Sequence, residues 1–326
     1  MRIDIRPFRD SDAEDLSRLC KLLIDSAYPS LRRSSEPEYY LWRRNENPAG
    51  KGAIFLAVAN DKLVGCFGCT PKRVRCNKQT WLAAEINDAF VLGDYQGLGL
   101  FRRLIERAFD WAKAEGVQFL YGTPNSTVLP IYVQKMGFQV AKGCDIRLLV
   151  SPVFPWYKTD LRTRPFTAGD LTTDYVQRQN DPFSEASAAS LPDWDKAFEI
   201  IHDLEYLHWR FIAGPDHYEI LDNVAVVKTG TWGPLRVGYL ADLLKGRAER
   251  NQWFLWLQRA RQHFRSQRLH LAAGWLDLRR LPCATVLSRG WVPYRKKPII
   301  LKAVDDNFVP ELVSEWVFGM ADSDNI

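Results

Sequence analysis

The stretch EINDAFVLGDYQGLGLF, residues Glu85–Phe101, decides the fold of this chain. Its first part is apolar and strand-like, its middle is a loop that contains Gln96, Gly97 and Gly99, and its last residues open an amphipathic helix. Glycines let a backbone approach an anion closely, and the N–H groups at the start of a helix attract negative charge. The stretch therefore predicts a strand, an anion-binding loop and a helix, in that order.

The loop differs from the patterns of nucleotide-binding sites. It lacks the lysine of a Walker loop and has no complete GxGxxG, which argues against binding of nucleoside triphosphates and dinucleotides. A GxG sequence before a helix also occurs for structural reasons alone, so the loop by itself leaves the ligand open.

The residues around this stretch predict a mixed α/β fold. Upstream we expect a strand, a helix, a hairpin and the strand that enters the loop: 3–8, 11–25, 53–59 with 62–76, and 81–92. Downstream we expect a glycine-bearing loop that leads into a long helix, then a strand, a short helix and a final strand or strand pair: 94–116, 117–122, 125–135 and 138–150. In the long helix, Leu104, Ala108, Trp111 and Ala112 share one face.

Length and composition indicate a globular protein of about two domains. The chain has 326 residues, of which 46% are hydrophobic and 25% charged, and this excludes wholesale disorder. Lys and Arg number 44 against 39 Asp and Glu, and the charges are interleaved, which makes nucleic-acid binding unlikely as a dedicated role. The 12 tryptophans indicate cores or interfaces packed with rings, such as a helix face with Trp253, Trp256, Leu257 and Ala260.

Targeting signals and metal-binding patterns are absent from the sequence. No stretch approaches the ~20 apolar residues of a membrane span, and the first residues lack the apolar run of a signal peptide. We therefore expect a cytoplasmic protein with no membrane partner. Cys66 and Cys69 form a CxxC in a strand, where an odd offset sends the thiols to opposite faces. The histidines show neither HxH nor HExxH spacing, so no metal is predicted: His202, His208, His217, His263 and His270.

Two short echoes suggest that the chain repeats one fold. Tyr40–Arg43 (YLWR) has a counterpart in Leu207–Arg210 (LHWR), and Gly137-Phe138 parallels Gly290-Trp291, each after a helical run and before a strand. The segment between the repeats is rich in Pro, Ser, Thr and Asp. The expected domains are residues 1–150, a linker and domain entry at 151–195, and a second domain at 196–326.

The first half resembles the GNAT N-acetyltransferase superfamily. In that family a loop of pattern Q/R-x-x-G-x-G/A binds the pyrophosphate of coenzyme A; Gln96 and Gly99 match it, whereas Phe101 stands at the last position. A second signature is matched by four residues in order: Asn125, Tyr132, Gly137 and Phe138. The resemblance covers about residues 1–150 and implies two tandem GNAT-like domains, of which the second is degenerate because its GYLADLLKGRAERN region lacks such a loop.

The resemblance implies a cofactor site for acetyl-CoA in the first half. Backbone amides of the loop would bind the pyrophosphate, and the bulk of Phe101 would alter how the cofactor packs. The N–H of Val91, with Phe90 beside it, would stabilise the oxyanion of the thioester. Asn125 would contact the amide arm of the cofactor or cap the helix that it precedes. The predicted cofactor-binding residues are Phe90, Val91, Gln96, Gly97, Leu98, Gly99, Leu100, Phe101 and Asn125.

Acyl transfer to an amine requires a base and an acid. By resemblance, Glu85 removes the proton of the amine, and Tyr132 donates its phenolic hydrogen to the departing sulfur. Asp88 is the competing carboxylate; it lies on the opposite face of a regular strand, and a bulge near the strand end would change that facing. Read without the motif, Glu85 is an exposed strand carboxylate and Tyr132 a core aromatic.

The expected activity is N-acyl transfer from acyl-CoA to a primary amine, with a small molecule such as an amino sugar as acceptor. The alternatives are a noncatalytic coenzyme A-sensing or protein-interaction module, and an acyltransferase that uses acyl carrier protein or aminoacyl-tRNA. The second half is expected to be catalytically silent and to shape the acceptor site, so that residues 1–150 alone would still bind coenzyme A.

Overall fold

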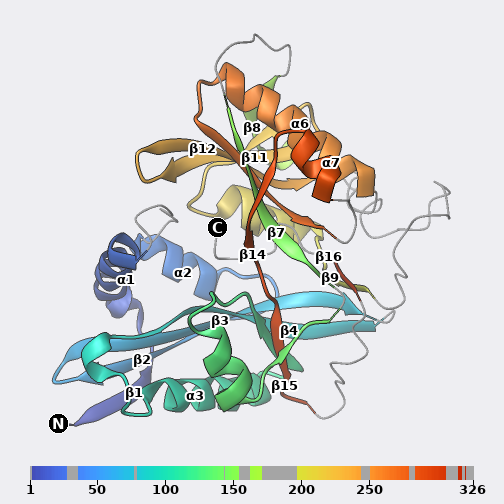
Figure 1. Ribbon diagram of the computed structural model, residues 1–326. Coiled ribbons are helices and arrows are strands. Elements are labelled where there is room, and N and C mark those ends of the chain that lie inside the picture. Colours follow the sequence, from blue (N-terminus) through green and yellow to red (C-terminus); the bar gives the residue numbers. More distant parts are fainter. Residues whose placement is uncertain are drawn as a thin grey trace.

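A computed structural model gives the structure of the protein (Figure 1). It describes residues 2–27, 36–76, 79–142, 144–153, 162–170, 197–243, 250–278, 283–305, 315–317 and 320. The side chains of 24–27, 76, 197, 250–253 and 315–317 are outside that description, and with them the predicted core position of Trp253. The described residues form two mixed sheets, one of nine strands and one of seven, that lie one above the other.

The first sheet confirms the mixed α/β order predicted from the sequence. Strands β1 to β4 are antiparallel neighbours, and β4 then pairs with β5 in parallel. The strands are β1 (Ile3–Pro7), β2 (Ala53–Ala59), β3 (Lys62–Cys76), β4 (Gln79–Val91), β5 (Phe119–Gly122) and β6 (Gln139–Val140). The helices are η1 (Asp10–Asp12), α1 (Ala13–Ala27), α2 (Pro37–Asn45), η2 (Gly93–Tyr95), α3 (Leu100–Ala114) and η3 (Ile131–Lys135), of which α2 lies where the sequence predicted only the YLWR echo.

Helices cover both faces of this sheet. Leu104, Ala108 and Ala112 of α3 are fully buried against the outer face, as the helical periodicity predicts, and Trp111 packs half-buried beside them. On the inner face, α1 and α2 share a core with residues of the second sheet. The inner face of the first sheet is therefore the contact surface between the two halves.

The second sheet repeats the first. Its strands run β8, β10, β11, β12, β13 in the same antiparallel order and again end in a parallel pair, β12 with β13. The strands are β8 (Thr163–Pro165), β10 (Glu219–Leu221), β11 (Ala225–Trp232), β12 (Leu235–Leu243), β13 (Leu271–Asp277) and β14 (Val292–Lys296). The helices are η4 (Ala168–Asp170), α5 (Leu204–His208), η5 (Trp209–Ala213), α6 (Arg250–Ser266) and α7 (Cys283–Ser288); Trp256, Leu257 and Ala260 of α6 are buried as predicted.

The two sheets exchange one strand each. Strand β15 (Ile300–Ala303), from the end of the chain, lies between β5 and β6 of the first sheet. Strand β7 (Ile146–Pro152), from the first half, lies between β13 and β14 of the second. Each strand covers a sheet edge whose N–H and C=O groups would otherwise be unpaired. Each sheet therefore contains strands from both predicted domains, 1–150 and 196–326. The predicted linker 151–195 contains β8.

The remaining two strands extend the first sheet beside β3. Strand β9 (Ala197–Ile200) pairs with the end of β3, and β16 (Glu315–Val317) pairs with β9 in parallel. Residues 171–196 lie outside the described residues.

The YLWR and LHWR echoes meet at the centre of the molecule. Trp42 of α2 stacks on Trp209 of η5, with ring centroids 4.5 Å apart and planes inclined by 14°. Arg43 and Arg210, the next residue of each echo, are both buried. The echoes are therefore equivalent parts of two repeats that face each other.

Candidate active site

A cleft opens through the first sheet where β4 and β5 separate. The two strands pair in parallel only at Ala83–Glu85 with Phe119–Tyr121, and beyond this point they diverge. The gap forms a cavity of about 160 Å³. It is lined by Ile86, Asn87, Asp88, Ala89, Gly122, Thr123, Pro124, Asn125, Val128, Tyr132 and Ile300.

A bulge in β4 shapes one wall of the cleft. Asp88 has φ 48°, and the register with β3 shifts between the pairs Gly68–Asn87 and Cys66–Phe90. Before the bulge Ile86 packs toward α3, and after it Ala89 does so, although a regular strand would send these two residues to opposite faces. The bulge thus changes the facing of Asp88, as the sequence analysis allowed.

The two candidate carboxylates have different surroundings. Asp88 lines the cleft and forms an ion pair with Arg43 of α2. Glu85 is fully buried on the face turned to the second sheet, in register with Thr70 and Tyr121. Its charge reaches Lys297, whose pKa is lowered by burial and by Arg295 and raised in part by Glu85. Glu85 is therefore a buried carboxylate, not the exposed one that the strand alone suggested.

Tyr132 lies inside the cleft, on the single turn of π-helix η3. Burial raises its pKa above the ordinary value, and the charge that Cys69 would carry as a thiolate raises it further. Its ring makes edge contacts with Phe101 and Phe138, with centroids 5.5 and 5.1 Å away. The phenol therefore stays protonated at neutral pH, as a proton donor must.

The loop after β4 has the backbone conformation that its glycines predict. Gly97 and Gly99 have φ 80° and 72°, a region that other residues rarely adopt, and Gly99 is the N-cap of α3. Gln96 folds back, and its Nε2 donates to the carbonyl of Val91 at 3.0 Å. Leu98 is exposed and Leu100 is buried. A Cβ at Gly97 or Gly99 would meet no atom within 4 Å, so the loop backbone is open at these two positions.

Asn125 caps the turn that follows β5. Its Oδ1 accepts hydrogen bonds from the N–H groups of Thr127 and Val128, both at 3.0 Å. Asn125 also lines the cleft, so its two predicted roles are compatible.

Sequence reasoning missed several residues of the site. Asn87 Oδ1 and Thr123 Oγ1 are buried at the cleft and have no hydrogen-bond partner among the described residues. Ile300 comes from β15, at the other end of the chain, and Arg43 lies 45 residues before Asp88. Nothing local in the sequence indicates these contacts, although the YLWR echo includes Arg43.

A second, more open hollow of about 510 Å³ lies between the two halves. Glu46 and Pro48 line it from the first half, and Glu205, His208 and Trp209 from the second, together with Ala168, Leu204 and Ala213. In the part of the chain that the structure describes, no group of three His, Cys, Asp or Glu residues is placed to hold a metal. No helix among the described residues is long and apolar enough to span a membrane.

Comparison with known proteins identifies this arrangement. Residues 4–141 match the sequence model of the acetyltransferase (GNAT) domain. This part of the chain therefore has the sequence pattern of a GNAT domain. An uncharacterised N-acetyltransferase of Methanocaldococcus jannaschii is 30% identical over 111 residues, which are 32% of this chain and 47% of that protein. The chain thus matches about half the length of this curated relative.

Solved structures show that the whole chain has a tandem GNAT fold. A tandem GNAT protein from the clavulanic acid biosynthesis pathway superposes with a TM-score of 0.56 at 12% identity, covering 93% of this chain and 99% of that one. A GCN5-related N-acetyltransferase from Sphaerobacter thermophilus has a TM-score of 0.53 at 15% identity, with 93% and 96% coverage.

Equivalent hydrogen bonds align the two GNAT repeats residue by residue. Gln118 N donates to Leu82 O, and His270 N donates to Arg236 O, so that Tyr239 of β12 takes the place of Glu85 in β4. Phe138 N donates to Tyr132 O six residues earlier, and Trp291 N donates to Val286 O five residues earlier; the extra residue of the first repeat lies in the π-helical turn η3. The second GNAT repeat therefore carries Tyr239 and Val286 where the first carries its candidate base and acid.

Proposed function

We propose that the protein is an acyl-CoA-dependent N-acyltransferase with a single catalytic centre in the cleft of the first GNAT domain. The observation that carries this proposal is the position of Tyr132, a buried and protonated phenol inside the opening between β4 and β5. The loop from Gln96 to Phe101 lies at the end of β4, one of the two strands that form this opening. The proposed donor is acetyl-CoA.

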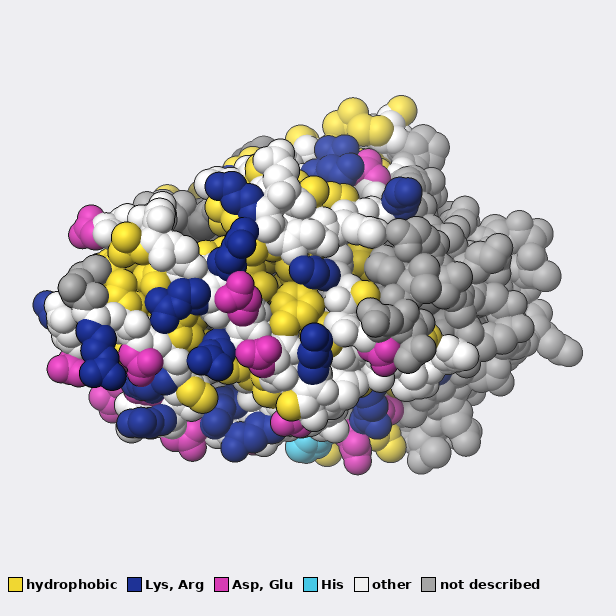
Figure 2. All heavy atoms as spheres, turned by 90° about the horizontal axis from the view of Figure 1, so that it is seen from below, with side chains coloured by type: hydrophobic (Ala, Val, Ile, Leu, Met, Phe, Trp, Pro, Cys, Tyr) yellow, Lys and Arg dark blue, Asp and Glu magenta, His cyan; other side chains and the backbone are white. Residues whose placement is uncertain are grey.

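The cleft offers the groups that the amide arm of coenzyme A requires. Asn87 Oδ1 is an acceptor and Thr123 Oγ1 is a donor or acceptor, and both are buried without a partner among the described residues. The pyrophosphate would lie at the start of α3, on the N–H groups of the loop. Arg102 and Arg103 are exposed there, and Figure 2 shows Lys and Arg side chains distributed over this underside of the molecule.

The proposed step is a direct transfer. The amine nitrogen attacks the thioester carbon, the N–H of Val91 or Phe90 stabilises the oxyanion, and the amine proton passes to Glu85. The C–S bond then breaks, and the thiolate takes the phenolic proton of Tyr132. The Tyr132 phenolate is reprotonated from solvent after the products leave.

We assign the base to Glu85 because the carboxylate of Asp88 is engaged by Arg43. A carboxylate in a buried ion pair is held in its charged form and is a weak proton acceptor. Glu85 lies earlier on the same strand, on the face turned to the second half. Because Glu85 is fully buried and lines neither the cleft nor the hollow between the halves, the amine proton would reach it through an intervening water.

The proposed acceptor is the primary amine of a small molecule, such as an amino sugar. The hollow between the halves is lined by the carboxylates of Glu46 and Glu205, which suit an ammonium group. We further propose that the second half is catalytically silent, since it has Tyr239 and Val286 at the positions of base and acid.

The test is to incubate the full chain with acetyl-CoA and a panel of amino sugars, small amines and amino acids, and to follow release of free thiol. We expect turnover with at least one acceptor, and ~10²-fold less with Glu85→Gln, while Asp88→Asn alters the rate and keeps the acidic limb of the pH profile, where protonation of the base lowers the rate. Acetyl-CoA at ~100 times its dissociation constant should stabilise the protein by ~2.7 kcal/mol. Stabilisation without turnover on any amine would favour a coenzyme A sensor; no stabilisation would favour a carrier-protein or aminoacyl-tRNA donor.

A further inference from the structure

Helix α2 connects the junction between the two halves with the cleft. Two consecutive residues make the connection: Trp42 stacks on Trp209 of the second half, and Arg43 reaches Asp88 on the bulge of β4. The sequence motifs of the GNAT resemblance do not include Arg43, so this ion pair is not part of the predicted site.

Arg43 is held in one position by its surroundings. Its side chain is 2% exposed, its Nη2 lies 2.5 Å from Asp88 Oδ2, and its Nη1 lies 3.4 Å from the hydroxyl of Tyr39. The guanidinium also lies 5.0 and 5.6 Å from the ring centroids of Tyr39 and Tyr40. Because buried charges are costly unless paired, removal of either partner of this ion pair would leave an uncompensated charge.

Asp88 in turn occupies the strained residue of the bulge. A left-handed backbone is unfavourable for residues other than glycine, although Asp adopts it more readily than most, so a contact made in this conformation adds to its stability. The ion pair with Arg43 is such a contact. Residues 86–89 line the cleft, and the bulge sets the direction in which the following N–H groups of β4 point.

We propose that Arg43 is a positioning residue of the transfer step, which fixes the β4 bulge through Asp88 and thereby aims the backbone donors of residues 89–91 at the thioester. The expected change in kcat rests on the proposed function. The expected effect on the β4 bulge rests on the Arg43–Asp88 pair alone. Arg43 itself contacts neither the acyl group nor the amine.

The experiment compares Arg43→Met, Arg43→Lys, Asp88→Asn and the double variant Arg43→Met/Asp88→Asn in the full chain. Arg44→Met is the matched control, because the neighbouring Arg44 pairs with Asp10 at the surface, 3.0 Å away, and lines no part of the cleft. We expect kcat to fall by on the order of 10²-fold in Arg43→Met and in Asp88→Asn, with the dissociation constant of acetyl-CoA changed by less than about threefold. The double variant should fall no further than either single one, and Arg43→Lys should recover part of the rate.

Hydrogen–deuterium exchange supplies a readout that does not depend on activity. Peptides covering 86–91 should exchange faster in Arg43→Met and in Asp88→Asn than in the wild type and in Arg44→Met. Additive losses of kcat, a raised KM with unchanged kcat, or unchanged exchange in 86–91 would each overturn the inference. If the wild type transfers no acyl group, the proposed function fails, whereas the exchange data still decide whether Arg43 holds the bulge. Should Arg43→Met not fold, Arg43→Lys and Asp88→Asn carry the same comparison.

Discussion

At position 101 the chain carries a phenylalanine where the GNAT loop pattern has Gly or Ala. The ring of Phe101 packs inward, edge-on to Phe67 and Tyr132, with centroids 6.1 and 5.5 Å away. It therefore supports the proposed acid from behind instead of occupying the phosphate loop. The sequence analysis expected its bulk to alter the packing of the cofactor; the structure places that bulk against Tyr132.

Substitution of Tyr132 by Phe tests the proposed acid. Because the ring contacts with Phe101 and Phe138 remain, we expect unchanged affinity for acetyl-CoA and a kcat lowered by about 10²-fold. Steady-state kinetics and calorimetric titration of acetyl-CoA measure the two quantities. Tyr294→Phe is the control, since that ring is 46% exposed on β14 of the second sheet. Equal losses of affinity and turnover would mark Tyr132 as a packing residue.

The tyrosine that replaces Glu85 in the second repeat should influence alkaline stability. Burial raises the pKa of Tyr239 to about 12, above the ordinary value of ~10 for the unfolded chain. The contribution of neutral Tyr239 to the free energy of unfolding is therefore complete below pH ~10. It is lost as the pH rises toward 12, because the phenol ionises at a lower pH in the unfolded chain than in the folded one. Two pKa units correspond to about 3 kcal/mol. Urea unfolding of the wild type and Tyr239→Phe from pH 8 to 12 should give a shallower decline for the variant; parallel curves would contradict this.

At the scale of elements, the loop between β4 and α3 requires glycine because of its backbone conformation and not because a side chain would lack space. A Cβ at Gly99 would meet no atom within 4 Å, yet its φ of 72° is unfavourable for any β-branched residue. The local fold therefore requires glycine here for the direction of the N–H groups at the start of α3.

Gly99→Val should accordingly weaken acetyl-CoA binding by at least tenfold without unfolding the protein. Gly93→Val is the matched control, because Gly93 also has free space for a Cβ but lacks the positive φ. Titration of acetyl-CoA, with the melting temperature recorded alongside, separates binding from folding. Unchanged affinity in Gly99→Val would remove this loop from the proposed cofactor site.

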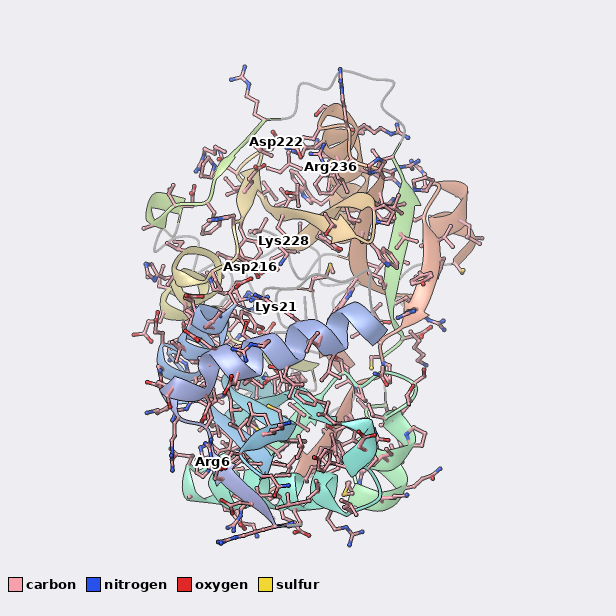
Figure 3. The ribbon with its side chains drawn as sticks, turned by 90° about the vertical axis from the view of Figure 1, so that its left-hand side faces the viewer. Arg6, Lys21, Asp216, Asp222, Lys228 and Arg236 are labelled. Atoms are coloured by element: carbon pink, nitrogen blue, oxygen red, sulfur yellow. The ribbon has the colours of Figure 1, made fainter. Side chains whose placement is uncertain are left out.

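At the scale of the whole molecule, the exchange of β7 and β15 makes each sheet incomplete without the other half. Ile300 of β15 lines the cleft, and Lys302 Nζ donates to the carbonyl of Met136 at the end of η3, at 2.7 Å. The second half thus contributes directly to the wall and to the support of Tyr132. In the second half, the ion pair of Lys228 with Asp216 lies on the side toward the first half (Figure 3).

This exchange changes the expectation for the isolated first half. Residues 1–150 lack β15, which leaves one edge of β5 exposed and β6 without its partner strand, so we now expect this fragment not to bind acetyl-CoA. A peptide of residues 297–305 added in trans should restore part of the binding, and a scrambled peptide should not. Calorimetric titration measures both. Binding by the fragment alone would show that the cleft forms without its inserted strand.

The sequence by itself determined the elements and the class of fold. The alternation of apolar residues predicted β2 to β5, the helical periodicity of residues 104–112 predicted α3, and glycines marked the turns that need a positive φ. These features are local, because each depends on residues that are neighbours in the chain. The paired echoes also predicted the repeat, since similar cores require similar patterns.

Only the tertiary structure decided how these elements combine into a site. The insertion of β15 beside β5, the assignment of β7 to the second sheet and the pairing of Arg43 with Asp88 join residues far apart in the chain. A strand pattern specifies which face is apolar but not which strand lies next to it, so the exchange is invisible in the periodicity. The bulge at Asp88 likewise has no local signal, because this left-handed Asp lies inside strand β4 and not at a turn, where the sequence marks such residues as it does at Asn60 and Asp61.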